Sequence, residues 1–101
     1  MHKILVLYPK GQDDRKFRAH YESKHLALTA KLPGMIAQRH SFAVEGMRGA
    51  EAPYYCVFEA DFPDAATMVK ALQSSEGAAV AADGPNYVTV PPTIMHYEVK
   101  S

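Results

Sequence analysis

The chain has 101 residues, and its eleven Lys and Arg residues balance its eleven Asp and Glu residues. No basic stripe or acidic tail stands out, so we expect no nucleic-acid partner. No apolar run approaches the roughly 20 residues of a membrane span, and the run at the N-terminus is too short for a signal peptide. The single cysteine, Cys56, cannot form an internal disulfide, which is typical of a reducing compartment. We therefore expect one domain over residues 1–101 in the cytoplasm, with no membrane partner.

The first third of the chain predicts a strand followed by a helix. The β-branched, leucine-rich and aromatic run 4–8 has apolar residues on both faces and predicts a buried strand. From Arg15 to about Lys31 the apolar residues recur with helical spacing, and His25 falls about 40° from Tyr21 on the shoulder of the apolar face. The run Leu32-Pro33-Gly34 closes this helix, because glycine permits the backbone of a helix end.

The remaining two thirds predict two strands, a broken helix and a last strand. Residues 36–45 alternate loosely, and Tyr54 to Phe62 is the strongest strand pattern in the chain. A helix over 65–73 is interrupted at Ser74-Ser75 and continues as a short alanine-rich helix over 76–83. Residues 93–99 read as a final strand, and Pro91-Pro92 places its start at an edge or a bend. The order β-α-β-β-α-β predicts an α+β, ferredoxin-like fold with helices on one face of an antiparallel sheet.

The other face of that sheet needs a cover. The first and third strands are apolar or aromatic on both faces, and a monomer would expose too much of that surface. Face-to-face pairing of two copies covers it most simply and gives a homodimeric α/β barrel with a ligand space in each half. A crossed sandwich or a covering tail would also serve.

Several sequence features together resemble the EthD family, named for ethyl tert-butyl ether degradation. They are the opening run 4–9, the helix segment 17–21 with His25 and Leu28, the closing Leu32-Pro33-Gly34, and Ser75-Glu76-Gly77. This resemblance covers nearly the whole chain and implies the dimeric α/β barrel fold. EthD proteins are similar to muconolactone-type isomerases, small polyketide cyclases and several monooxygenases, so the resemblance implies the fold more firmly than the reaction.

His25 matches the histidine that the family carries in its first helix, and we interpret it as the catalytic residue. A neutral imidazole can take and return a proton near pH 7, which suits a reaction without a cofactor. The alternative is a histidine that packs in the seam between helix and sheet. Tyr21, one helical turn earlier, is expected either to orient the ligand or to be a core aromatic residue.

The strand residues give further ligand-binding candidates. Four of them share the strand faces that we expect to turn into the barrel: Gln38, His40, Cys56 and Phe58. A mostly apolar cavity with a few polar groups is typical of a small-molecule site. If the strands present their other faces to the barrel, these four residues pack under the helices, and the cavity is lined by Arg39, Tyr55 and Glu59. A shift of one residue in the assumed register is enough to reverse the two faces of a strand. Cys56 lacks a cationic neighbour in the sequence, which favours a buried inert thiol.

No cofactor or metal is predicted. His20 and His25 are five residues apart, which splays them around an α-helix, unlike the four-residue spacing of zinc-binding helices. The sequence has no flavin or nicotinamide motif and no tryptophan to support haem chemistry. We therefore predict a cofactor-independent enzyme for a small aromatic or lactone-like compound, with His25 as general acid and base. The alternatives are a monooxygenase or accessory oxidoreductase of a degradation pathway, and a ligand-binding dimer without activity.

Overall fold

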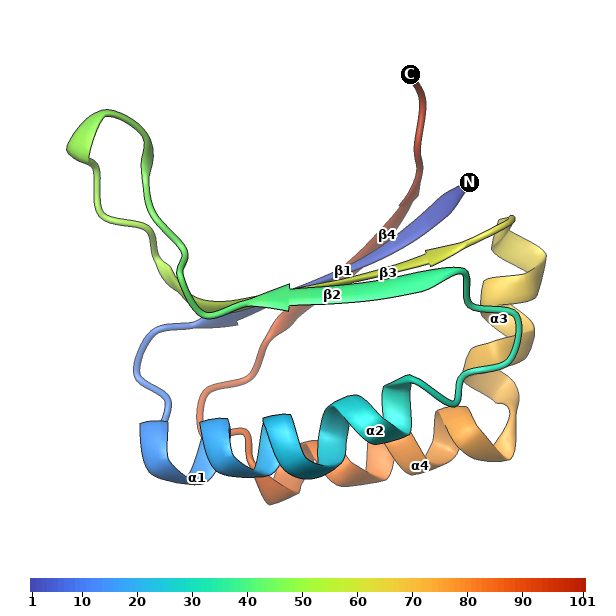
Figure 1. Cartoon of the computed structure of the whole chain (residues 1–101), viewed down its shortest axis with the longest axis horizontal. Coiled ribbons are helices and arrows are strands. Elements are labelled where there is room, and N and C mark those ends of the chain that lie inside the picture. Colours follow the sequence, from blue (N-terminus) through green and yellow to red (C-terminus); the bar gives the residue numbers. More distant parts are fainter.

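The structure, a computed structural model, describes residues 1–101 and has the predicted ferredoxin-like order. Its four strands form one antiparallel sheet in the order β2-β3-β1-β4. The strands are β1 (His2–Pro9), β2 (Ala37–Ser41), β3 (Tyr54–Phe62) and β4 (Thr93–Glu98). The α-helices lie together on one face of this sheet (Figure 1). β4 is an edge strand, as predicted.

The first helix is continuous over residues 14–29 but is not α-helical throughout. It consists of α1 (Asp14–His20), a π-helical segment η1 (Tyr21–His25) and α2 (Leu26–Thr29). The side chain of Asp13 caps its N-terminus by accepting a hydrogen bond from the Lys16 amide. In η1 the Leu26 amide donates to the Tyr21 carbonyl, five residues back. One extra residue is therefore accommodated in this turn, which the regular helical spacing of the sequence did not predict.

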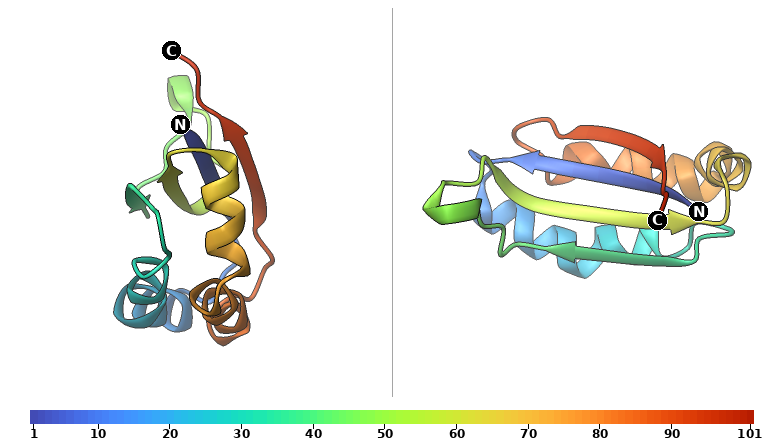
Figure 2. Two further views of the ribbon diagram at one scale, coloured as in Figure 1. Left: turned by 90° about the vertical axis from the view of Figure 1, so that its right-hand side faces the viewer. Right: turned by 90° about the horizontal axis from the view of Figure 1, so that it is seen from above.

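The second helical region is divided as expected. Helix α3 (Ala65–Gln73) descends from the end of β3, and α4 (Ser75–Asp83) then runs beside the first helix (Figure 2). The extended backbone of Ser74 ends α3, while the Ser74 hydroxyl accepts from the Gly77 amide and caps α4. Two 3₁₀ turns complete the elements: η2 (Met47–Gly49) between β2 and β3, and η3 (Gly84–Asn86) directly after α4. None of these helices combines the length and apolar character needed to cross a membrane.

The core lies between the sheet and the helices. Side chains of β1 alternate along the strand, and Ile4, Val6 and Tyr8 are buried against the helix layer. Their partners on β3 are Ala60, Phe58 and Cys56, which face the same way. The helices contribute mainly Phe17, Tyr21 and Met68 to this cluster. The strands therefore present the opposite faces to those we expected, and Cys56 and Phe58 pack under the helices and do not face a barrel interior.

The turn that follows the first helix depends on Gly34. Gly34 has a φ of +78°, a backbone conformation that side chains disfavour. A Cβ atom added there would lie 2.4 Å from Cγ2 of Thr67, at the start of α3. Gly34 therefore has the permissive backbone that was predicted, but it serves the turn that leads into β2, whereas the helix itself ends at Thr29.

The other face of the sheet carries no helix. It presents Leu5, Leu7 and Val57, none of which is fully buried by this chain alone. Beside them Lys3 and Arg39 bind the carboxylates of Glu59 and Asp61, with the Arg39 Nη2 to Asp61 Oδ2 distance at 2.7 Å. The loop between β2 and β3 rises on this same side, away from the helices (Figure 1). The pairing of two such faces in a homodimer stays a prediction.

Candidate functional site

A cavity of about 630 Å³ lies between the sheet and the helix layer. Its walls come from β1, β3, η1, α2 to α4, and the segment that runs from η3 into β4. Most of the side chains lining it are apolar, as in typical small-molecule sites. Six lining residues have polar side chains: Tyr8, His25, Thr29, Tyr87, Thr89 and His96. The cavity thus lies on the helix side of the sheet.

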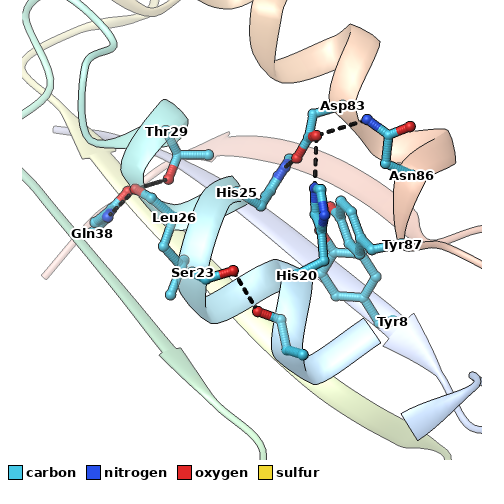
Figure 3. Close-up of polar contacts among 11 residues, drawn as sticks. Tyr8, His20, Ser23, His25, Leu26, Thr29, Gln38, Asp83, Asn86 and Tyr87 are labelled. Atoms are coloured by element: carbon cyan, nitrogen blue, oxygen red, sulfur yellow. Dashed lines mark hydrogen bonds and ion pairs between the residues drawn. The ribbon is translucent and has the colours of Figure 1, made fainter. Parts of the chain in front are cut away.

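The π-helical turn brings His20 and His25 to one carboxylate, that of Asp83 at the end of α4 (Figure 3). His25 Nδ1 lies 2.8 Å from Asp83 Oδ2, and His20 Nε2 lies 2.8 Å from Asp83 Oδ1. The expectation that these two histidines splay apart is therefore wrong. It assumed an α-helix, whereas the wider π turn places residues five apart on the same side of the helix.

Asp83 is held firmly in its ionised form. Its side chain is buried, and Asn86 Nδ2 donates a third hydrogen bond to Oδ1 at 3.0 Å. Burial alone would raise the pKa of Asp83, but the hydrogen bonds from Asn86, His25 and His20 outweigh it and lower that pKa to about 2. At neutral pH the histidines therefore face a carboxylate, which can only accept hydrogen bonds.

The second ring nitrogen of His25, Nε2, is left without a partner in the protein. Because the Asp83 carboxylate accepts from Nδ1, the neutral ring carries its hydrogen on Nδ1 and a lone pair on Nε2. Nε2 has no hydrogen-bond partner in the chain and is not sealed from solvent, and His25 lines the cavity. Burial lowers the pKa of His25 below its usual value, and Asp83 offsets only part of this effect. His25 is therefore a neutral base at pH 7.

An aromatic wall surrounds this histidine. The centroid of the Tyr87 ring lies 4.6 Å from that of His25, and the Tyr21 ring stacks on His25 at 5.4 Å and meets Tyr87 edge-on. The hydroxyls of Tyr8 and Tyr87 form a hydrogen bond of 2.8 Å with each other. Burial raises the pKa of Tyr8 to about 12, so this pair stays uncharged. The imidazole is thus restrained by aromatic contacts as well as by Asp83.

Tyr21 and the strand candidates take different positions. Tyr21 is a core residue that does not line the cavity, and its buried hydroxyl makes no hydrogen bond. Gln38 joins β2 to the first helix by accepting from the Thr29 hydroxyl at 2.6 Å and donating to the Leu26 carbonyl. His40 is exposed, and its ring centroid lies 5.9 Å from that of Tyr21. Neither strand residue lines the cavity.

The candidates of β3 lie under the helices. Phe58 lines the cavity, whereas Cys56 is fully buried beside it. Burial raises the pKa of Cys56 to about 12, which keeps the thiol protonated. Arg39 and Glu59 point to the helix-free face, and Tyr55 packs on Phe17. The strands thus have the second of the two predicted orientations, in which Cys56 and Phe58 pack under the helices. Both alternatives placed the cavity on the helix-free face, whereas it lies on the helix side.

Several residues of the site were not predicted, among them Asp83, Tyr87 and His96. Asp83 is 58 positions from His25, and only the packing of α4 beside the first helix brings the two together. The position of Asp83 at the end of an amphipathic helix, just before Gly84-Pro85, is the only local signal it carries. No three His, Cys, Asp or Glu side chains are arranged so that they could hold a metal ion together.

The fold and the site together define a ferredoxin-like protein with an apolar cavity and a carboxylate-held histidine at its wall. The model of the EthD domain matches residues 9–91, and the chain therefore belongs to the EthD family.

Known relatives agree with this assignment. The chain is 26% identical over 89 residues to an uncharacterized 11.0 kDa protein in the thcB-thcC intergenic region of Rhodococcus erythropolis, covering 88% of this chain and 85% of that protein. The crystal structure of an ethyl tert-butyl ether degradation (EthD) family protein from Bacillus halodurans is similar with a TM-score of 0.88 and 27% identity, over 99% of both chains. An EthD-like protein from Ralstonia eutropha shares the fold at a TM-score of 0.78 and 23% identity, over 99% of this chain and 92% of that one.

Proposed function

We propose that this chain is a cofactor-independent enzyme that acts on a small aromatic or lactone-like compound, with His25 as general acid and base. One observation carries the proposal: a neutral histidine, fixed by Asp83, presents its free Nε2 at an apolar cavity. Catalytic bases need this combination of a held ring and a pKa near or below neutrality.

The proposed step is a proton transfer within the bound compound. His25 Nε2 takes a proton from a weakly acidic C–H or O–H group, and the electron pair delocalises into the adjacent carbonyl or ring. The imidazolium that forms is stabilised by the Asp83 carboxylate through Nδ1–H. The same nitrogen then returns the proton to another atom of the compound. The outcome is an isomerisation or cyclisation with no net change in redox state.

Asp83 acts in this scheme as a positioning residue. It fixes the tautomer of His25 and the orientation of the ring, and Asn86 and His20 in turn fix the carboxylate. Tyr87 packs against the imidazole and restricts its rotation.

The assembly that we propose is a homodimer in the cytoplasm, formed through the helix-free face of the sheet. Leu5, Leu7 and Val57 supply the apolar part of that face. A second copy would cover it without obstructing the cavity, which lies on the opposite side of the sheet. The buried reduced thiol of Cys56 is consistent with that compartment.

The test is solvent deuterium exchange, because it needs no knowledge of the product. Enolisable probes such as 2-tetralone and α-angelica lactone are incubated in D₂O with the wild type, and NMR follows the loss of the acidic C–H signal. We expect catalysed exchange that falls by about 100-fold or more in His25→Gln. The matched control is His40→Gln, which changes an exposed histidine outside the cavity.

Equal exchange in His25→Gln and the wild type would contradict the proposal. Oxygen uptake with a phenol or hydroquinone, in place of exchange, would favour the monooxygenase alternative. Binding of the probes without either reaction would favour a ligand-binding protein.

A further inference from the structure

We infer that the cavity selects an uncharged ring compound with one hydroxyl or carbonyl group over a carboxylate of the same shape. This inference rests on the proposed function, since it names the substrate class of the same site. It narrows that class by charge, which neither the sequence nor the family assignment does.

The charge of the cavity wall is the first argument. None of the 23 residues that line the cavity is Lys or Arg, although the chain has eleven such residues. A carboxylate that enters would lose its hydration without gaining a cationic partner, which is strongly unfavourable. The nearest fixed charge to His25 is the Asp83 carboxylate, which would repel an anion bound at this histidine. An uncharged compound meets neither cost.

The hydrogen-bonding capacity of the wall is the second argument. Tyr8 and Tyr87 are bonded to each other, and the Thr29 hydroxyl donates toward the Leu26 carbonyl and Gln38. Thr89 Oγ1 accepts from the Asp13 amide. Only the hydroxyl hydrogens of Thr89 and of one tyrosine of the pair stay free, which are few donors for a strongly hydrated ligand.

Two ring nitrogens at the cavity wall also lack a hydrogen-bond partner. One is His25 Nε2, described above, and the other is Nε2 of His96, whose Nδ1 lies 2.8 Å from His2 Nε2. A ligand with one or two polar atoms can satisfy them, whereas a carboxylate brings two oxygens with about four lone-pair sites that need donors. His25 presents a lone pair and no hydrogen at this nitrogen, so it accepts from a hydroxyl but cannot donate to an anion.

The size and the shape of the wall favour rings. A volume of about 630 Å³ lies within the range of about 300–1,000 Å³ that small-molecule sites have. Flat or rigid side chains form much of the wall, among them Phe58, Pro85 and Tyr87. Such surfaces stack well on one- or two-ring compounds.

The experiment compares 2-naphthol with 2-naphthoate by calorimetry at neutral pH, where the first is uncharged and the second is an anion. We expect the wild type to bind 2-naphthol at least about tenfold more tightly. Equal affinities, tighter binding of the acid, or no binding of either compound would overturn the inference.

A designed cation tests the reason for the selectivity. Leu72 lines the cavity on α3 and is 46% exposed, so a lysine there can reach the cavity mouth while its stem stays packed. We expect L72K to bind 2-naphthoate at least about tenfold more tightly than L72Q does, because both variants lose the leucine and differ in charge. Equal affinity of the two variants for 2-naphthoate would show that charge does not set the selectivity.

The result is separable from the proposed function. If 2-naphthol is preferred but His25→Gln leaves all deuterium exchange unchanged, the selectivity inference stands and the catalytic proposal fails. If His25 is needed for exchange and a carboxylate probe is bound and turned over as well as its neutral analogue, the catalytic proposal stands and the inference fails.

Discussion

The ring of His25 and the carboxylate of Asp83 are joined by a contact of 2.8 Å, although the two residues are 58 positions apart in the chain. One lies in the π-helical turn η1 and the other at the last residue of α4, so the contact forms only when the two helices lie side by side on the sheet. The base of the proposed site is therefore made by tertiary packing and by no single segment.

Replacing Asp83 with asparagine should change the pH dependence of the reaction as well as its rate. The amide can donate to Nδ1 and move the ring hydrogen to Nε2, which removes the lone pair from the cavity. The loss of the carboxylate should also lower the pKa of His25 further, because Asp83 raises it in the native protein. We expect deuterium exchange to slow by at least about tenfold, with its acid limb moved to lower pH.

The measurement is the exchange rate of 2-tetralone over a pH series for wild type and Asp83→Asn. Glu76→Gln, in the first turn of the same helix and outside the cavity, is the control. A slower rate with an unmoved acid limb would mean that Asp83 acts on folding alone.

The stability of the fold should fall in mild acid because of His25. Its pKa is lowered in the native state from an ordinary value of 6.5, so the unfolded chain binds a proton that the native chain does not. The free energy of unfolding is therefore expected to decrease as the pH falls from about 6.5 toward the lower native pKa. Urea titrations between pH 7.5 and pH 5 measure this slope. In His25→Gln the slope should become shallower; an unchanged slope would assign it to other groups.

Cys56 should be unreactive in the folded protein. It is fully buried, and its pKa of about 12 leaves almost no thiolate at neutral pH. We expect the disulfide reagent DTNB to label the native chain far more slowly than the chain in concentrated urea. Rapid native labelling would show that the helices open over β3 more often than a stable core allows.

Two aromatic residues of the first helix should differ in their tolerance. The Tyr21 hydroxyl is buried without a partner, so Tyr21→Phe should change the free energy of unfolding by less than about 1 kcal/mol or increase it. Phe17 is fully buried among five other aromatic rings, and Phe17→Ala should cost about 3–5 kcal/mol. Urea denaturation measures both. A large loss in Tyr21→Phe would indicate that a water or a ligand binds this hydroxyl.

The homodimer is tested on the helix-free face of the sheet. Val57→Asp places a carboxylate among Leu5 and Leu7, and burying it in a dimer would be unfavourable. We expect light scattering to give a dimer for the wild type and a monomer for Val57→Asp. Val69→Asp makes the same change on an exposed position of α3 and should remain dimeric. A monomeric wild type would rule out the proposed assembly.

The sequence was sufficient for the order of the elements, because their signals are local. Alternation in residues 54–62, the Ser74 cap and the Gly34 turn all lie within a few residues of the structure they produce. His25 as a candidate rests on the family likeness. The side of the sheet that holds the cavity could not be read from strand parity alone, since Cys56 and Phe58 would be apolar in either arrangement.

Asp83 could not be predicted from the sequence, for a related reason. Its carboxylate has no distinctive neighbours in the chain, and its partner histidines become neighbours in space only through the π turn. An extra residue in a helical turn has no clear sequence signal, so the regular α-helical spacing gave the wrong faces for His20 and His25.

The π turn has a consequence for how this helix can change. The geometry around Asp83 depends on His20 and His25 lying on the same side of the helix. Deleting one residue between them, such as the exposed Ser23, would let the turn relax to an α-helix in which the two histidines are four residues apart. Residues four apart also share one face of an α-helix, so both imidazoles would still face the carboxylate. A deletion at this turn would therefore preserve the site, whereas the same deletion within α1 would rotate the downstream side chains by about 100°.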